Sequence, residues 1–252
     1  MPTFEEEYRR IEPTLQRWGS LILLGKKIEI RGAANFVRQG PSLIIGNHCG
    51  AAKDIAVLIR SVPRQIYFTA NRQIFTREEF EVLIRKHLVR HLGDFGAAVN
   101  SLLRPIKAGF VRFVSSNIRK VGTIPVDLTA GSQETRFQIQ RYLEKGRAVI
   151  ALQGRGRVQP RDRHPYVSPF RRGTSAIAHA LYSRAGISVP VTPLAIFGTQ
   201  RPWLVPGTIK LNVGEPMYVE PYADGPAGDV VERFRAALEA RVKALFLELL
   251  KD

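Results

Sequence analysis

Short apolar runs of strand length alternate with longer amphipathic stretches of helical length along the chain. Strands are expected where polarity alternates or where about four to eight apolar residues follow one another. These segments are 26–32, 42–47, 65–70, 123–128, 147–154, 188–198 and 207–214. Helices are expected over 4–24, 51–62, 76–93, 106–122, 131–146, 173–186 and 227–252. Thr76, with Glu79 three residues later, has the pattern of a helix N-cap.

Strands that alternate with helices indicate an α/β fold in layers, with a mixed central sheet flanked by helices. No linker rich in Gly, Ser or Pro divides residues 28–252. The sequence therefore predicts one α/β domain over 28–252, preceded by an amphipathic helical segment over 1–27.

The N-terminal segment combines an apolar end with basic neighbours. Its stretch LQRWGSLILLG places Trp18 beside a compact apolar cluster, with arginines upstream and Lys26 and Lys27 downstream. A helix of this composition is typical of the bilayer interface. The same pattern fits a helix that packs on its own domain, and the sequence leaves both interpretations open.

The chain carries a large excess of positive charge. Its 252 residues include 38 Lys and Arg against 22 Asp and Glu, a formal net charge of +16. Such a surface attracts nucleic acid, anionic lipid headgroups, or phosphorylated and CoA-like ligands. The zinc-finger spacings, RNP-like aromatic blocks and basic zippers that mark nucleic-acid-binding modules do not occur. We therefore expect no nucleic-acid partner.

Cysteine usage and hydropathy narrow the expected cellular setting. A single cysteine excludes an intramolecular disulfide and a Cys-rich zinc site, and it suits a reducing, cytosolic compartment. The start, MPTFEEEYRR, lacks the apolar segment of a secretory signal. No run reaches the ~18 apolar residues of a membrane-spanning helix, so none is expected.

The stretch SLIIGNHCGAAKDIAVL, residues 42–58, puts a histidine and an aspartate at a strand-to-helix junction. His48 follows the expected buried strand, and Asp54 lies six residues later. A carboxylate beside an imidazole fixes its tautomer and stabilises the imidazolium, so such a pair can act as a general base. The small residues between them would leave room for a substrate. A histidine near an aspartate can equally be structural, so by itself the pair is a hypothesis.

Four blocks of sequence form an ordered set around this pair. They are IEIRGAANFVRQGPSLIIGNHCGAAKD, IRKVGTIPVDL, GRAVIALQGRGR with the later SPFRRGTSAIAHA, and SVPVTPLAIFGT. Together they resemble the blocks of the glycerolipid acyltransferase superfamily, the group that includes 1-acylglycerol-3-phosphate acyltransferase. The resemblance extends from about Ile28 to Val219, and four ordered blocks are more specific than any one of them.

The resemblance implies a reaction and its participants. An acyl group would pass from acyl-CoA or acyl carrier protein to a hydroxyl of a lysophospholipid-like acceptor, with His48 as general base and Asp54 as its orienting partner. No metal or other cofactor is implied, and the expected location is peripheral, at an anionic membrane surface on the cytoplasmic face. Cys49 is either a small filler beside the base or a nucleophile, although the chemistry requires no acyl-enzyme.

The spacing of the catalytic pair departs from the family pattern. The family usually has four residues between His and Asp, and this chain has five. On one continuous helix the additional residue would rotate the aspartate by about 100°. Lys53 occupies the usual Asp position and cannot accept the imidazole N–H. We therefore expect Asp54 to be the partner, with the additional residue absorbed in the turn before the helix.

Two further departures fall on the side that would bind the acceptor. Leu128 stands where the family usually has an Arg, and Gln153, or Gly154 in a shifted register, stands where it usually has a Glu. Nearby arginines offer compensation, because guanidinium groups and exposed backbone amides bind phosphate well. The predicted substrate-binding residues are Gln153, Gly154, Arg155, Arg157 and Arg172. A basic loop in contact with solvent only is the alternative for the arginines.

These departures keep two other functions open. The acceptor could lie outside the glycerolipids, as an amino-lipid, a glycolipid or an amine. Alternatively, the displaced aspartate could mark a catalytically inactive, lipid-binding homologue.

Overall fold

The computed structural model describes residues 4–86, 101, 104–127, 133–154, 167–201 and 205–251. Contacts divide the chain into two compact units. The smaller comprises Met1–Glu12 and Phe68–Thr135, and the larger comprises Pro13–Tyr67 and Arg136–Asp252. The boundary predicted between residues 27 and 28 separates a helical segment from a domain. The two contact-based units do not test it, so it stays a prediction.

The predicted mixed sheet is confirmed. Its strands are β1 (Lys26–Arg31), β2 (Ser42–Asn47), β3 (Ile66–Asn71), β4 (Ile124–Val126), β5 (Ala148–Gln153), β6 (Val191–Phe197) and β7 (Gly207–Val213). They follow the order β1-β7-β6-β2-β5-β3-β4. β2 is parallel to both β5 and β6, β7 is antiparallel to β6, and β1 is parallel to β7. Each strand lies within a segment expected from the hydrophobic pattern, except that β3 extends one residue further, to Asn71.

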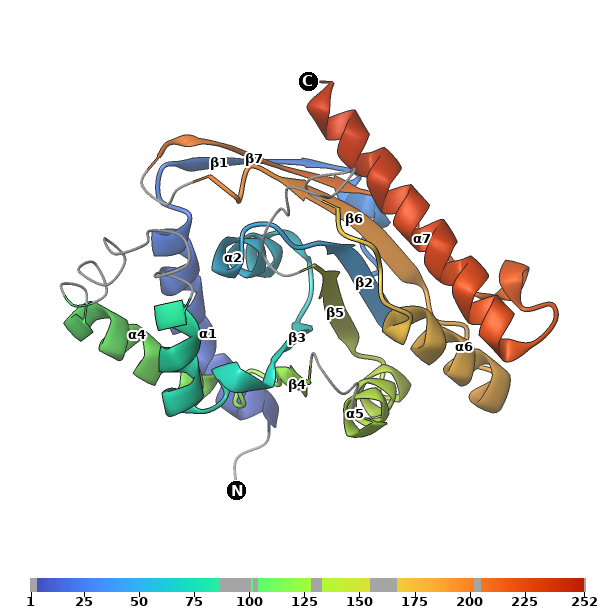
Figure 1. Cartoon of the computed structure of the whole chain (residues 1–252), viewed down its shortest axis with the longest axis horizontal. Coiled ribbons are helices and arrows are strands. Elements are labelled where there is room, and N and C mark those ends of the chain that lie inside the picture. Colours follow the sequence, from blue (N-terminus) through green and yellow to red (C-terminus); the bar gives the residue numbers. More distant parts are fainter. Residues whose placement is uncertain are drawn as a thin grey trace. The chain divides into compact units, whose positions relative to one another are not determined.

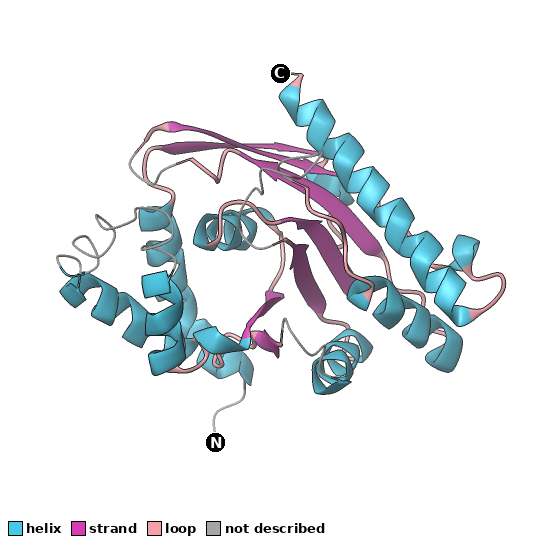
Figure 2. Ribbon diagram, viewed as in Figure 1, coloured by secondary structure: helices cyan, strands magenta, loops and turns pink. Residues whose placement is uncertain are grey.

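Helices lie between the strands, as expected (Figure 2). They are α1 (Phe4–Ile22), α2 (Ala52–Ser61), α4 (Arg104–Asn117), α5 (Gln133–Glu144), α6 (Gly173–Ala185) and α7 (Ala227–Leu250). A further helix begins after Thr76 and is described to residue 86; the rest of the predicted 76–93 segment lies outside the described residues. The hydroxyl of Thr76 donates to the Glu79 carboxylate at 2.9 Å, at the start of this helix as predicted.

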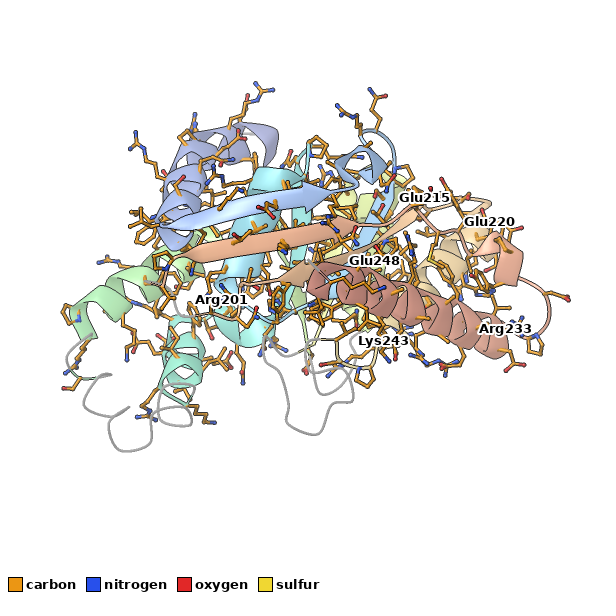
Figure 3. The ribbon with its side chains drawn as sticks, turned by 90° about the horizontal axis from the view of Figure 1, so that it is seen from above. Arg201, Glu215, Glu220, Arg233, Lys243 and Glu248 are labelled. Atoms are coloured by element: carbon orange, nitrogen blue, oxygen red, sulfur yellow. The ribbon has the colours of Figure 1, made fainter. Side chains whose placement is uncertain are left out.

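The core of the larger unit is built on the strand β2. All six residues of β2 are buried, because helices cover both faces of the sheet around it. α7 packs against β6, β7 and α6 on one face, and α2 lies on the opposite face (Figure 1). Arg233, Lys243 and Glu248 mark the length of α7 (Figure 3), and Glu248 accepts a hydrogen bond from Asn212 of β7 at 2.7 Å.

The parallel strands of this unit end at one edge of the sheet. β2, β5 and β6 run in the same direction, so the residues that follow them emerge at the same edge. Ligand sites of open α/β sheets form at this carboxyl edge. His48, Gly154 and Gly198 are the residues that come directly after these strands.

The end of α1 leaves two leucines in contact with solvent. Leu21 is 50% exposed and Leu24 is 61% exposed, whereas Leu23 between them is buried. Within the described residues, no helix combines the length and the apolar character needed to cross a bilayer. Whether α1 lies at a bilayer interface remains a prediction.

Leu238 and Leu247 of α7 offer a matched test of this core. Leu238 is completely buried and Leu247 is 45% exposed. We expect Leu238→Ala to lower the free energy of unfolding by about 2–5 kcal/mol, because it leaves a cavity. Leu247→Ala should change it by no more than about 0.5 kcal/mol. Denaturant unfolding of the two variants checks this, and equal losses would contradict the assigned burial of α7.

Candidate active site

An asparagine side chain ties the carboxyl end of β2 to β6. Backbone pairing with β6 extends along β2 from Leu43 to Gly46. Beyond it, Nδ2 of Asn47 donates to the carbonyl of Ile196 at 2.8 Å, and Oδ1 accepts the N–H of Ile196 at 2.7 Å. Asn47 is fully buried, so water does not compete for these bonds. The residue before His48 is thereby held at a defined position between the two strands.

His48 and Asp54 form a hydrogen-bonded pair. Nδ1 of His48 lies 2.8 Å from Oδ2 of Asp54. The aspartate side chain is fully buried, whereas 24% of the histidine side chain is exposed. Because a carboxylate only accepts hydrogen bonds, Nδ1 is the donor, and in the neutral ring the lone pair lies on Nε2. This is the arrangement of a histidine base oriented by a carboxylate.

The same carboxylate oxygen orders the backbone that follows His48. Oδ2 of Asp54 accepts the N–H of Cys49 at 3.0 Å and the N–H of Gly50 at 2.8 Å. Asp54 lies in the first turn of α2, where the positive end of the helix dipole favours a negative side chain. Oδ1 is buried and makes no hydrogen bond within the described part of the chain. The three hydrogen bonds described here are therefore all accepted by Oδ2, the oxygen that faces His48.

The additional residue between His48 and Asp54 is taken up in a turn ahead of α2. The N–H of Lys53 bonds the carbonyl of Gly50 at 3.0 Å and closes this turn. Within the turn, Ala51 has φ 49° and ψ −117°. His48 lies before the helix, so Asp54 reaches it without sharing a helical face with it. The structure therefore pairs His48 with Asp54, the residue expected from the sequence.

Lys53, at the usual Asp position of the family, is directed away from the pair. Its Nζ donates to the carbonyl of Arg201. Partial burial and the nearby ammonium of Lys26 lower the pKa of Lys53.

Cys49 is a buried neighbour of His48. Its Sγ lies 3.2 Å from Oγ1 of Thr199, and only 5% of the residue is exposed. Burial, together with the negative charge of Asp54, raises the pKa of the thiol to about 12. A protonated thiol is a poor nucleophile. Of the two interpretations from the sequence, the small filler is the one that fits.

Gln153 and Gly154 lie beside the segment that carries His48. The pairing of β2 with β5 aligns Gln153 with Asn47, directly before His48. Oε1 of Gln153 accepts the N–H of Arg171 at 3.1 Å. Gly154 has φ 122°, and a Cβ placed on it would lie 3.2 Å from the carbonyl oxygen of His48. The structure thus brings these two predicted residues together with the His48–Asp54 pair.

Arg172 is the one predicted arginine that the structure describes, and it bonds to α7. The guanidinium of Arg172 donates to the carbonyl of Gly228 at 2.8 Å and lies 3.6 Å from the carboxylate of Glu232, both on α7. Arg155 and Arg157 lie outside the described residues, as does Leu128. Among the described residues, no three His, Cys, Asp or Glu side chains gather in a way that could hold a metal ion.

Two residues of the site were not singled out from the sequence alone. Asn47 fixes the end of β2, and the buried Thr199 contacts Cys49 from the residues that follow β6. Their position in the sequence could have indicated them, because each lies at or just beyond the carboxyl end of a strand. It becomes informative only once β2 and β6 are known to be parallel neighbours.

Comparison with solved structures finds this fold in the crystal structure of PlsC, the 1-acyl-sn-glycerophosphate (LPA) acyltransferase from Thermotoga maritima. The match has a TM-score of 0.57 at 18% sequence identity, and it covers 99% of this chain and 84% of that chain. At this identity the likeness shows the fold, and it confirms the fold that the resemblance in sequence implied. No protein-family model and no curated protein sequence matches the chain.

Cys49 is expected to resist alkylation in the folded protein. Because the pKa of its buried thiol is about 12, almost no thiolate exists near neutral pH. The reactive fraction should rise about tenfold per pH unit while the pH stays below that pKa. Iodoacetamide labelling followed by intact mass measures the rate, with the chain in guanidinium chloride as the reactive reference. Equally rapid labelling of the folded protein near neutral pH would contradict this environment.

Proposed function

We propose that this protein is an acyltransferase that moves a fatty acyl group from an acyl thioester to a hydroxyl of a lysophospholipid-like acceptor. The observation that carries the proposal is the 2.8 Å hydrogen bond between Nδ1 of His48 and Oδ2 of Asp54. It leaves Nε2 with a lone pair at the carboxyl edge of parallel strands. It does so in a fold shared with a 1-acyl-sn-glycerophosphate acyltransferase.

In the proposed reaction, His48 first acts as the general base. Nε2 takes the proton of the acceptor hydroxyl while the hydroxyl oxygen attacks the thioester carbonyl carbon. The carboxylate of Asp54 stabilises the imidazolium that forms. When the tetrahedral intermediate collapses, the C–S bond breaks and the proton on Nε2 passes to the leaving thiolate. The products are the ester and the free thiol, and His48 is neutral again.

Cys49 takes no part in this reaction. Transfer occurs directly from the thioester to the acceptor, so no acyl group is attached to the protein. The raised pKa of the Cys49 thiol supports this, since the side chain beside the base stays protonated.

The substrates are proposed from the residues around the pair. The donor would be acyl-CoA or acyl carrier protein. Gln153, aligned with Asn47, and Gly154, close to His48, would bind the acceptor. Arg172 would add a guanidinium for a phosphate, together with Arg155 and Arg157, which lie outside the described residues. The ion pair of Arg172 with Glu232 is 3.6 Å long and solvent-exposed, so exchanging it for a substrate phosphate would cost little.

The protein is proposed to act as a peripheral protein on the cytoplasmic face of a membrane. A net charge of +16 attracts an anionic bilayer surface. The exposed Leu21 and Leu24, at the end of α1, are followed directly by Lys26 and Lys27. Exposed apolar side chains beside cationic ones are the combination that an anionic interface binds.

A second candidate function keeps the reaction and changes the acceptor. Gln153 presents a neutral amide where the family usually has a carboxylate, and its Oε1 is occupied by the N–H of Arg171. An acceptor outside the glycerolipids would be compatible with such a neutral group. The inactive alternative was motivated by the displaced aspartate, and the hydrogen bond between His48 and Asp54 counts against it.

His48→Ala should lower acceptor-dependent thioester consumption by about 10²–10⁴-fold, because it removes the general base. The measurement uses palmitoyl-CoA and a panel of lysolipid acceptors, with release of free CoA thiol as the readout. His179→Ala on α6 is the matched control, since it removes a histidine that lies outside the pair. Equal rates for wild type and His48→Ala would show that His48 is structural.

The acceptor panel also decides between the two candidate substrates. We expect lysophosphatidic acid or a related lysophospholipid to support the highest rate. A clear preference for an amino-lipid, a glycolipid or an amine would favour the second candidate. Membrane binding without turnover for any acceptor and either donor would favour an inactive, lipid-binding protein.

A further inference from the structure

Ala51 holds a backbone conformation that alanine rarely adopts. Its φ of 49° and ψ of −117° lie near the first central position of a type II′ turn, where glycine is strongly favoured. Among the non-glycine residues that the structure describes, it is the one with positive φ. Such a conformation costs energy and persists only where the surrounding structure enforces it.

The residues before Ala51 are held from two sides. On one side, Oδ2 of Asp54 accepts the N–H groups of Cys49 and Gly50. On the other side, Gly50 lies against Thr199 so closely that an added Cβ would be 2.2 Å from Cβ of Thr199. The main chain therefore enters the turn with little freedom to move in either direction.

The side chain of Ala51 is not what holds the turn. Ala51 and Ala52 are both exposed, so neither methyl group is fixed by packing. Ala52 is the first residue of α2, whereas Ala51 precedes the helix. The two positions thus share exposure and residue type, and they differ in backbone conformation.

We propose that Ala51 is a positioning residue. The strained turn that it forms accommodates five residues between His48 and Asp54 and so keeps Asp54 within reach of His48. Without this turn, the additional residue would belong to α2 and would rotate the carboxylate by about 100°. The conformational part of the inference stands on the turn alone. Its consequence for turnover rests on the proposed acyltransferase function.

Glycine substitutions at the two alanines test the strain directly. Ala51→Gly should raise Tm by about 2–4 °C, because glycine adopts positive φ without a steric penalty. Ala52→Gly should lower Tm by up to about 3 °C, because glycine is unfavourable in a helix. Thermal unfolding followed by circular dichroism measures both. If Ala51→Gly lowers Tm as Ala52→Gly does, Ala51 is not strained and the proposal is overturned.

Valine substitutions test whether the turn positions Asp54. A β-branched residue is excluded from positive φ, so Ala51→Val should shift the turn and loosen the bonds of Asp54 to Cys49 and Gly50. Cys49 should then be alkylated at least about tenfold faster in Ala51→Val than in Ala52→Val, because the shifted turn exposes the buried thiol. For acyl transfer, Ala51→Val should lower kcat further than Ala52→Val does, with little change in KM.

The outcomes separate this inference from the proposed function. If Ala51→Val equals Ala52→Val in both alkylation and kcat, the turn does not position Asp54. If wild type shows no acyl transfer with any substrate, the proposed function fails, and the Tm and alkylation measurements still decide the inference. If Ala51→Val does not fold while Ala52→Val does, position 51 does not tolerate valine, as expected. The glycine variants then decide the inference, because we expect Ala51→Gly to raise Tm and Ala52→Gly to lower it.

Discussion

A single carboxylate oxygen, Oδ2 of Asp54, connects the parts of the candidate active site. It accepts the imidazole N–H of His48 together with the backbone N–H groups of Cys49 and Gly50. Because Asp54 is fully buried, loss of the carboxylate would leave these backbone donors without their partner, at a cost of about 1–3 kcal/mol each. The orientation of the histidine and the path of the main chain around it thus depend on the same atom.

The sheet provides the rigid frame on which this oxygen acts. β2 lies between β5 and β6, and all three end at the same edge. Asn47 extends the link to β6 by one residue, through both polar groups of the Ile196 backbone. The position of His48 is therefore set by buried strand pairing, and Asp54 has only to set the direction of its ring.

Neighbouring side chains at this edge differ in reactivity because their surroundings differ. His48 is partly exposed and is oriented by a carboxylate, as the base of the proposed reaction requires. Cys49, the next residue, is buried, and burial together with the negative charge of Asp54 raises the pKa of its thiol. Asp54 thus orients the imidazole of His48 and, together with burial, raises the pKa of the neighbouring thiol.

The sequence by itself determined the alternation of strands and helices and the mixed α/β class, and it indicated His48 and Asp54 as a candidate pair. These features follow from apolar periodicity and from chemistry within one short segment. Two features were decided by the tertiary structure alone. Asn47 is hydrogen-bonded to Ile196, which is 149 positions away along the chain, and Thr199 packs closely against Gly50. The tertiary structure also directed Arg172 to α7, because the start of α6 meets the start of α7. The conformation of Ala51 could not be predicted, since an alanine side chain carries no preference for positive φ and only the bonds around it impose one.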